Sequence, residues 1–209
     1  MSKNICIAGA KTIADWELLR PKLIAPTLDL PAWNEAKEFM NQRINTRYLE
    51  SIEALRNHGP SLKGEGFAIC TIICSLIEAI ETFYTGKNFT TKPTNEFEYG
   101  SRKSGNNFNN FLTTRKPFSE YFDKALAKDF YANVRCALLH EACTRNGWVI
   151  NIREHETIVI KNGTKTLNRS LFVADLKECI KRHNKELDSS EELREAFLRK
   201  FDGICANSM

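Results

Sequence analysis

The chain lacks the features that mark several classes of protein. It has only 6 prolines and 10 glycines among 209 residues and no repeating period, which excludes collagen-like, low-complexity and solenoid folds. Its longest apolar run, Phe67 to Ile80, is interrupted by Glu78 and is too short for the roughly 20 apolar residues of a membrane span. The first residues show no basic segment followed by an apolar stretch, so no secretory signal is expected. These absences predict a soluble, cytoplasmic protein without a membrane partner.

Excess charge of one sign is also scarce. The 30 Lys and Arg residues exceed the 26 Asp and Glu residues by a formal net charge of +4. Such a small excess is compatible with a polyanionic partner but not with a dedicated nucleic-acid coat protein. The composition, with 42% hydrophobic and 27% charged residues, indicates a chain that folds.

The seven cysteines are odd in number and lie mostly in apolar segments that are predicted to be helical. Without an export signal, free buried thiols are expected rather than a disulfide framework. Cys136, His140 and Cys143 are spaced to share one helical face, but three ligands from a single helix make an incomplete metal set. The sequence therefore predicts no metal and no other cofactor.

Most of the chain has the apolar period of three to four residues that is typical of helices. Residues 1–30 are predicted to be an irregular N-terminal segment with one short helix at 12–19, and residues 31–205 a single helical domain. The expected helices of this domain lie at 31–57, 66–84, 108–113, from 117 onwards, 130–144, 170–187 and 190–204. A loop is expected at 86–107.

At about 148–168 the apolar period changes to two, and an Asn162-Gly163 turn interrupts it. This pattern predicts a small antiparallel β-hairpin or meander. The predicted fold class is therefore mainly α, a helical bundle with a β insertion.

The segment from Phe130 to Trp148, FYANVRCALLHEACTRNGW, contains polar residues within an apolar stretch of sequence. Arg135 and His140 are costly to bury unless they have partners. They are five residues apart, so their side chains diverge by roughly 140° on a straight helix. They converge on one ligand if the Arg side chain wraps round the helix, or if a second copy of the helix supplies complementary groups. The second arrangement is a cleft between two helices across a two-fold axis.

Arg135-Cys-Ala-Leu-Leu-His140 is an Arg-x4-His motif late in a predicted helical bundle, and over about residues 33–145 the chain resembles the HEPN superfamily. The resemblance implies a HEPN-like bundle and a homodimer in which the motifs of both subunits face each other. Many members are metal-independent endoribonucleases of toxin, defence or RNA-processing systems, and others are inactive relatives that bind nucleotides or partner proteins. Carried over to this chain, His140 is the catalytic general acid–base group and Arg135 holds the scissile phosphate.

These residue types suit the cleavage of RNA through its own 2′-hydroxyl. A histidine exchanges protons near neutral pH, and a guanidinium is permanently charged and binds phosphate oxygens through paired hydrogen bonds. The predicted function is a metal-independent endoribonuclease with a composite site at a dimer interface, in a toxin or defence role, with an antitoxin or regulatory protein as a partner. Cys136 stands where active members often have a polar residue. The alternative is a catalytically inactive HEPN-like module that binds a nucleotide or a partner.

Three further residues are predicted to support the motif. Glu78 and Glu81 are the only charges of the upstream apolar helix, and in the family an acidic residue on this helix typically contacts the motif. Glu78 is preferred because it lies deeper in the apolar run. Asn133 is seven residues before His140, on nearly the same helical face, and is predicted to orient it.

Each of these residues can also be interpreted as having a purely structural role. Arg135 with Glu78 or Glu81 is then a buried ion pair that fixes helix register, and His140 is a core or helix-end histidine. The remaining histidines are interpreted as solvated surface residues: His58, His155 and His183.

The predicted loop and the residues that follow it are locally basic. Between residues 86 and 116, six basic residues outnumber two acidic ones. These six are the predicted RNA-binding residues: Lys87, Lys92, Arg102, Lys103, Arg115 and Lys116. Aromatic side chains are interleaved with them: Phe89, Phe97, Tyr99, Phe108 and Phe111. Either this strip guides single-stranded RNA by charge and stacking, or it is a solvated loop whose aromatic side chains dock on the bundle.

Overall fold

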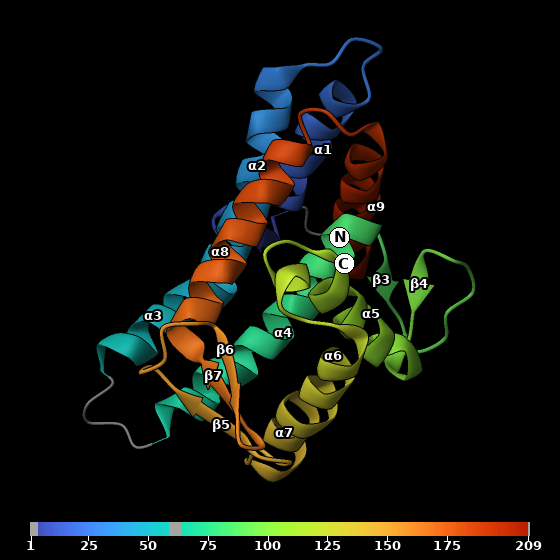
Figure 1. The fold of residues 1–209 in the computed structure, drawn as a ribbon. Helices are drawn as coiled ribbons and strands as arrows, with labels where there is room; N and C mark the ends of the chain where they lie inside the picture. The colour runs from blue at the N-terminus through green and yellow to red at the C-terminus, as the bar shows by residue number, and fades with distance from the viewer. Residues whose placement is uncertain (1–3, 59–63, 209) are drawn as a thin grey trace. The chain divides into compact units, whose positions relative to one another are not determined.

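The structure is a computed structural model that describes residues 4–58 and 64–208 (Figure 1). About 65% of the protein is helical, with small sheets, which confirms the predicted mainly α class. The chain divides into two compact units. The first contains the described residues up to Ser51, Thr82–Tyr99 and the described residues from His183 onwards. The second contains the described residues of Ile52–Glu81 and Gly100–Arg182.

The first unit combines helices with two short strand pairs. Its elements are β1 (Cys6–Ala8), β2 (Lys11–Thr12), α1 (Ile13–Leu23), α2 (Leu30–Ile44), the π-helical turn η1 (Asn45–Leu49), β3 (Asn88–Phe89), β4 (Glu98–Tyr99) and α9 (Glu191–Asn207). β1 and β2 are antiparallel, whereas β3 and β4 are parallel. The N-terminal segment is more regular than predicted. Thr12 and Asp15 form a capping box that starts α1, and this helix continues through Pro21 to bury Leu23.

Aromatic side chains form the core of the first unit. Trp16 of α1 stacks on Phe201 of α9 with ring centroids 4.7 Å apart, and Phe39 of α2 meets both rings edge-on. Phe83 and Phe197 extend this cluster. Such ring pairs add to the hydrophobic stabilisation of burial alone, so they hold the helices of this unit in place.

His183 was wrongly interpreted as a solvated residue, because its side chain is fully buried. Its ring contacts the aromatic rings of Phe83, Tyr84 and Phe197. His183 continues the buried stripe of its helix, four residues after Cys179, and the polar residues on either side of it in the sequence hid this position.

The second unit holds the motif helix and the three-stranded sheet. Its elements are α3 (Glu50–Asn57), α4 (Glu65–Thr85), α5 (Ser101–Thr114), the 3₁₀ turn η3 (Phe118–Glu120), α6 (Lys124–Phe130), the π-helical turn η4 (Tyr131–Cys136), α7 (Ala137–Glu141), β5 (Trp148–Asn151), β6 (Ile158–Lys161), β7 (Thr164–Asn168) and α8 (Arg169–Glu186). The first two residues of α3 and the last residues of α4 and α8 belong to the first unit.

The β insertion lies where it was predicted but is not purely antiparallel. β6 and β7 form the expected hairpin through Asn162 and Gly163, which both have positive φ. β5 instead pairs with the other edge of β7 and runs parallel to it, so the strand order is β5-β7-β6. The period of two predicts strands but not their order. The parallel register places Trp148 opposite Lys165, and both of these side chains contact Asp129.

The loop predicted at 86–107 is shorter than expected, because α5 begins at Ser101. The buried face of α5 includes Ser104 and Asn107 as well as Phe108 and Phe111. Two core-facing positions are therefore polar, and they hid the apolar period of the helix.

Two other helix boundaries also differ from the prediction. After Pro117 a 3₁₀ turn precedes α6, because the carboxylate of Asp123 accepts from the backbone N–H of Leu126 and starts the helix there. The motif helix ends at Glu141, before Thr144, because Ala142 adopts a left-handed backbone conformation with φ of 53°.

Among the described residues, α4 is the helix that is long and apolar enough to cross a membrane by length and composition, with a mean hydropathy of 1.7 over its most apolar window. Its 21 residues exceed the apolar run from Phe67 to Ile80, so the helix is long enough for a span although that run is not. However, 56% of that window is buried within the fold. The core helix of a soluble protein passes the same test, so length and composition alone do not identify a span.

Candidate functional site

The Arg-x4-His motif lies where the helical backbone changes its pitch. Arg135 belongs to the π-helical turn η4, between α6 and α7, and His140 lies in the last turn of α7. A π-helical turn has a wider ring of hydrogen bonds than an α-helix and is frequent at functional sites.

Glu78 of α4 holds the guanidinium of Arg135. The Nε and Nη2 atoms of Arg135 donate to Glu78 Oε1 at 3.0 and 2.8 Å, and the hydroxyl of Ser104 donates to Glu78 Oε2 at 2.5 Å. Burial alone would lower the pKa of Arg135, but the carboxylate of Glu78 outweighs this effect and raises it. The two side chains are 19% and 18% exposed, so the side chain of Arg135 remains partly in contact with solvent.

Tyr131 completes the surroundings of Arg135, and it was missed in the sequence analysis. The guanidinium carbon lies 5.3 Å from the centre of the tyrosine ring. Burial raises the pKa of Tyr131. Gly105 of α5 makes room for this ring, because a Cβ atom at Gly105 would lie 3.0 Å from Tyr131 Cε1. The four-residue spacing of Tyr131 and Arg135 along the helix is the feature of the sequence from which this contact could have been predicted.

His140 is exposed, and within the described part of the chain no hydrogen bond holds its ring. It is therefore not a core histidine. The neighbouring Leu139 is 48% exposed, so the end of α7 presents an apolar side chain beside the imidazole.

Asn133 interacts with its own helix and with the segment that follows it. Its Nδ2 donates to Asp129 Oδ1 at 2.9 Å, and its backbone carbonyl accepts from the N–H of Arg145. Asn133 also lies inside the π-helical turn, where the α-helical rotation of 100° per residue no longer applies. Its predicted role toward His140 therefore has no hydrogen bond in its support.

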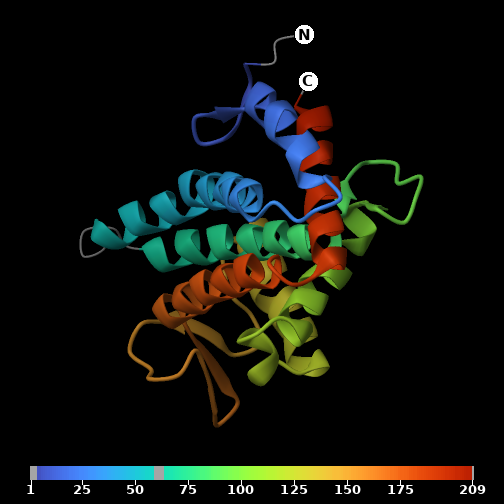
Figure 2. The ribbon, with the colours of Figure 1, turned by 90° about the horizontal axis from the view of Figure 1, so that it is seen from above.

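Asp129 joins the motif helix to the three-stranded sheet. Its carboxylate accepts from Trp148 Nε1 at 2.7 Å and from Asn146 Nδ2 at 2.6 Å, and forms an ion pair with Lys165 at 2.9 Å. Burial alone would raise the pKa of Asp129, but the bonds from Lys165, Trp148 and Asn146 together lower it. Figures 1 and 2 show the sheet, in orange, beside the yellow segment that carries α6 and α7.

Replacing Asp129 with alanine is expected to lower the free energy of unfolding by about 1–3 kcal/mol, because the buried indole N–H of Trp148 and the partly buried Lys165 lose their acceptor. The wild-type contribution is complete above the ordinary carboxyl pKa of about 4 and is lost as the pH falls through the lower folded value. Urea denaturation at neutral and acidic pH measures both effects. Glu156→Ala, at an exposed position of the same unit, is the control. Equal unfolding free energies for Asp129→Ala and wild type at neutral pH would contradict this role.

Glu81, the other acidic residue of α4, has a different partner. It is fully buried, and its carboxylate accepts from Arg115 Nε at 2.9 Å, from Arg115 Nη2 at 3.1 Å and from Asn110 Nδ2 at 2.6 Å. Glu78 and not Glu81 therefore contacts the motif arginine.

No family model, curated protein or solved structure matches this chain. The local geometry of the site therefore carries the functional argument. No group of three or more His, Cys, Asp and Glu side chains within 4–58 and 64–208 is arranged to hold a metal ion. All seven cysteines are free thiols.

The six predicted RNA-binding residues are divided between the two units. Lys87 and Lys92 belong to the first unit, and the other four belong to the second. Lys92, Arg102 and Lys103 are exposed, whereas Arg115 is bound to Glu81. The remaining residue, Lys116, is exposed and lies 3.7 Å from Glu120.

The interleaved aromatic side chains are also divided in their exposure. Phe89 and Phe97 are 51% and 39% exposed, whereas Tyr99, Phe108 and Phe111 are buried. Most of these rings therefore dock on their own unit, and two remain at the surface.

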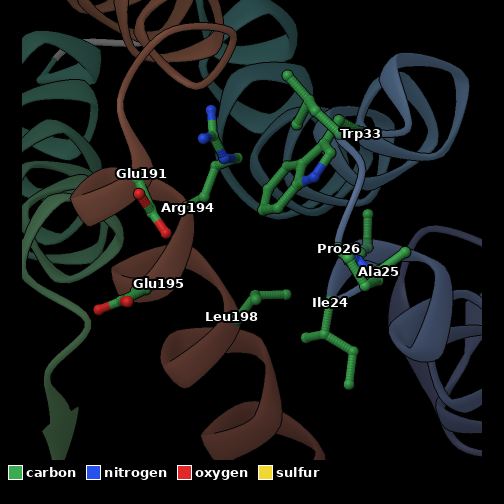
Figure 3. A pocket seen from close by; sticks show the side chains of 10 residues that line it. Ile24, Ala25, Pro26, Trp33, Glu191, Arg194, Glu195 and Leu198 are labelled. Atoms are coloured by element: carbon green, nitrogen blue, oxygen red, sulfur yellow. The ribbon is translucent and has the colours of Figure 1, made fainter.

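An open groove of about 460 Å³ lies in the first unit and was not predicted (Figure 3). Glu191, Arg194, Glu195 and Leu198 of α9 line one side, and the segment that follows α1 lines the other. The groove contains none of the predicted catalytic or RNA-binding residues.

Proposed function

We propose that this chain is a metal-independent endoribonuclease of the HEPN type, in which Arg135 and His140 of two subunits form one site. The observation that carries the proposal is the contrast between the two motif residues. Glu78 fixes the guanidinium of Arg135 while leaving it partly exposed, and His140 is exposed a few residues later on the same helix. A fixed cation and a histidine open to solvent are the groups that cleavage of RNA by its own 2′-hydroxyl requires.

The roles of the two residues follow from their chemistry. The imidazole of His140 accepts the proton of the 2′-hydroxyl as its oxygen attacks the adjacent phosphorus. The guanidinium of Arg135 stabilises the negative charge that develops on the phosphate oxygens. The bond from phosphorus to the 5′-oxygen breaks, and the leaving oxygen takes up a proton from water, while the imidazolium of His140 returns its proton to solvent. The products are a 2′,3′-cyclic phosphate and a 5′-hydroxyl.

A second subunit is part of the proposal because of the end of α7. Glu78 holds the guanidinium of Arg135, the imidazole of His140 is exposed at the end of α7, and among the described residues no contact joins the two side chains. A second copy of the motif would supply the complementary group to each. The exposed Leu139 beside His140 supplies apolar surface that a second copy would cover. The proposed cytoplasmic role in a toxin or defence system, under an antitoxin or regulatory protein, rests on the family resemblance.

The alternative is an inactive HEPN-like module that binds a nucleotide or a partner protein. Cys136 favours it, because this thiol follows the motif arginine where active members often have a polar side chain. Tyr131 and Arg135, whose pKa values it influences, are its neighbours. This module would bind a nucleotide without cleaving RNA at any pH.

The wild-type protein is expected to cleave single-stranded RNA in excess EDTA and to leave 2′,3′-cyclic phosphate ends. The assay separates labelled fragments and identifies their termini by phosphatase treatment and mass spectrometry. The rate per subunit is expected to rise with protein concentration over the range in which sedimentation shows a dimer forming. Fragments with 3′-hydroxyl ends, or cleavage that needs added metal, would refute the proposal.

A further inference from the structure

The first unit contains a group of basic side chains that have no acidic partner among the residues that the structure describes. Arg43, in the last turn of α2, and Arg47, in the π-helical turn that follows, both reach the backbone carbonyl of Ile7. Arg43 Nη1 donates to this oxygen at 2.5 Å and Arg47 Nη2 at 3.4 Å. Two guanidinium groups therefore converge on one neutral acceptor.

Lys200 of α9 is the third member of this group. Its Nζ lies 3.3 Å from the backbone carbonyl of Lys87 and 3.4 Å from Asn88 Oδ1. Burial lowers the pKa of Lys200 to about 8, and the positive charge of Arg43 contributes to this shift. Lys200 is therefore close enough to Arg43 for the two charges to repel each other.

No carboxylate among the described residues forms an ion pair with Arg43, Arg47 or Lys200. Burial lowers the pKa of Arg43 to about 10, and the neighbours that influence it most are Arg47, Tyr48 and Cys205. Neither tyrosine nor cysteine is ordinarily an anion at neutral pH.

Other basic residues of the first unit do have acidic partners. Arg20 pairs with Asp202 at 3.0 Å, and Lys37 pairs with Asp188. The unit therefore neutralises these charges, whereas it leaves the group around Arg43 uncompensated. Partly buried cations of one sign are unfavourable unless an anion accompanies them.

We propose that Arg43, Arg47 and Lys200 form a binding site for a phosphate group. Guanidinium groups match phosphate oxygens through paired hydrogen bonds, and an ammonium group adds a point charge. Three positive charges suit a doubly charged tetrahedral anion better than a single carboxylate. Arg47 is exposed, so the group is open to a ligand from solution. The site is independent of the proposed ribonuclease activity, because Arg135 and His140 belong to the second unit.

The test is isothermal titration calorimetry with inorganic phosphate at constant ionic strength and neutral pH. Wild type is expected to bind phosphate. Arg47→Gln is expected to bind it with an affinity at least about tenfold lower, because it loses one charge-assisted contact. Lys22→Gln removes one charge from an exposed position of the same unit and is expected to bind like wild type. Arg43→Gln loses a contact with β1, so circular dichroism first establishes that it folds.

Two further titrations identify the source of the phosphate. If a nucleoside monophosphate binds as tightly as a short single-stranded RNA, the ligand of the site is a free phosphorylated molecule. If the RNA binds more tightly than the nucleoside monophosphate, and Arg47→Gln loses this tighter binding, the site binds the phosphates of a nucleic-acid backbone. The proposal is overturned if wild type does not bind phosphate, or if Arg47→Gln and Lys22→Gln bind it equally well. Either result leaves the RNA cleavage assay unaffected, so the two proposals fail separately.

Discussion

Replacing His140 with alanine is expected to lower the rate of RNA cleavage by at least about 100-fold, which is the typical contribution of a positioned general acid–base group. The fold is expected to be unchanged, because the side chain is exposed and surface substitutions of this kind change stability by less than about 0.5 kcal/mol. The measurement compares initial rates of cleavage for wild type and variant at equal dimer concentration.

His155→Ala is the matched control for this experiment. His155 is another exposed histidine of the second unit, outside the motif helix, and its replacement is expected to leave the rate unchanged. If His140→Ala cleaves RNA as fast as wild type, the imidazole has no role in the chemistry. If His155→Ala loses as much activity as His140→Ala, the effect is not specific to the motif.

Replacing Glu81 with glutamine is expected to destabilise the protein by about 3–5 kcal/mol, which is the usual result of removing one partner from a buried ion pair. Glu81 is fully buried and accepts from both Nε and Nη2 of Arg115. Glutamine keeps one acceptor oxygen but removes the negative charge, so the guanidinium of Arg115 loses its counter-charge. Urea denaturation of wild type and variant gives the difference in free energy.

A double variant distinguishes the charge from the packing. Glu81→Leu combined with Arg115→Met removes both charges, and it is expected to be more stable than Glu81→Gln, because no charge then remains without its partner. Glu156→Gln, at an exposed position, is the control for removal of a carboxylate. A loss below about 1 kcal/mol for Glu81→Gln would show that this pair is not a major contribution to stability.

The pattern of apolar residues predicted the longest helices well. α4 and α9 have continuous apolar stripes, and their predicted and observed ends agree within a few residues. α5 was mostly missed, because Ser104 and Asn107 occupy buried positions where the pattern expects apolar side chains. Ser104 is buried because Glu78 accepts its hydroxyl. The polar side chain that binds Glu78 therefore interrupts the apolar pattern by which α5 could have been predicted.

The sequence predicted the partner of Glu78 but not the partner of Glu81. Glu78 was preferred as the partner of Arg135 because it lies deeper in the apolar run, and it binds Arg135, whereas Glu81 binds Arg115. These partners are 57 and 34 residues away in the chain. Which carboxylate meets which guanidinium depends on how α4, α5 and the motif helix pack.

Local periodicity and the cost of burying charge were enough to place Arg135 and His140 on one helix and to single them out. Tertiary packing alone decided that Glu81 binds Arg115 and that His183 is buried. It also brought the basic side chains of α2, η1 and α9 together. Periodicity acts between residues a few positions apart, whereas ion pairs and burial depend on segments far apart in the sequence.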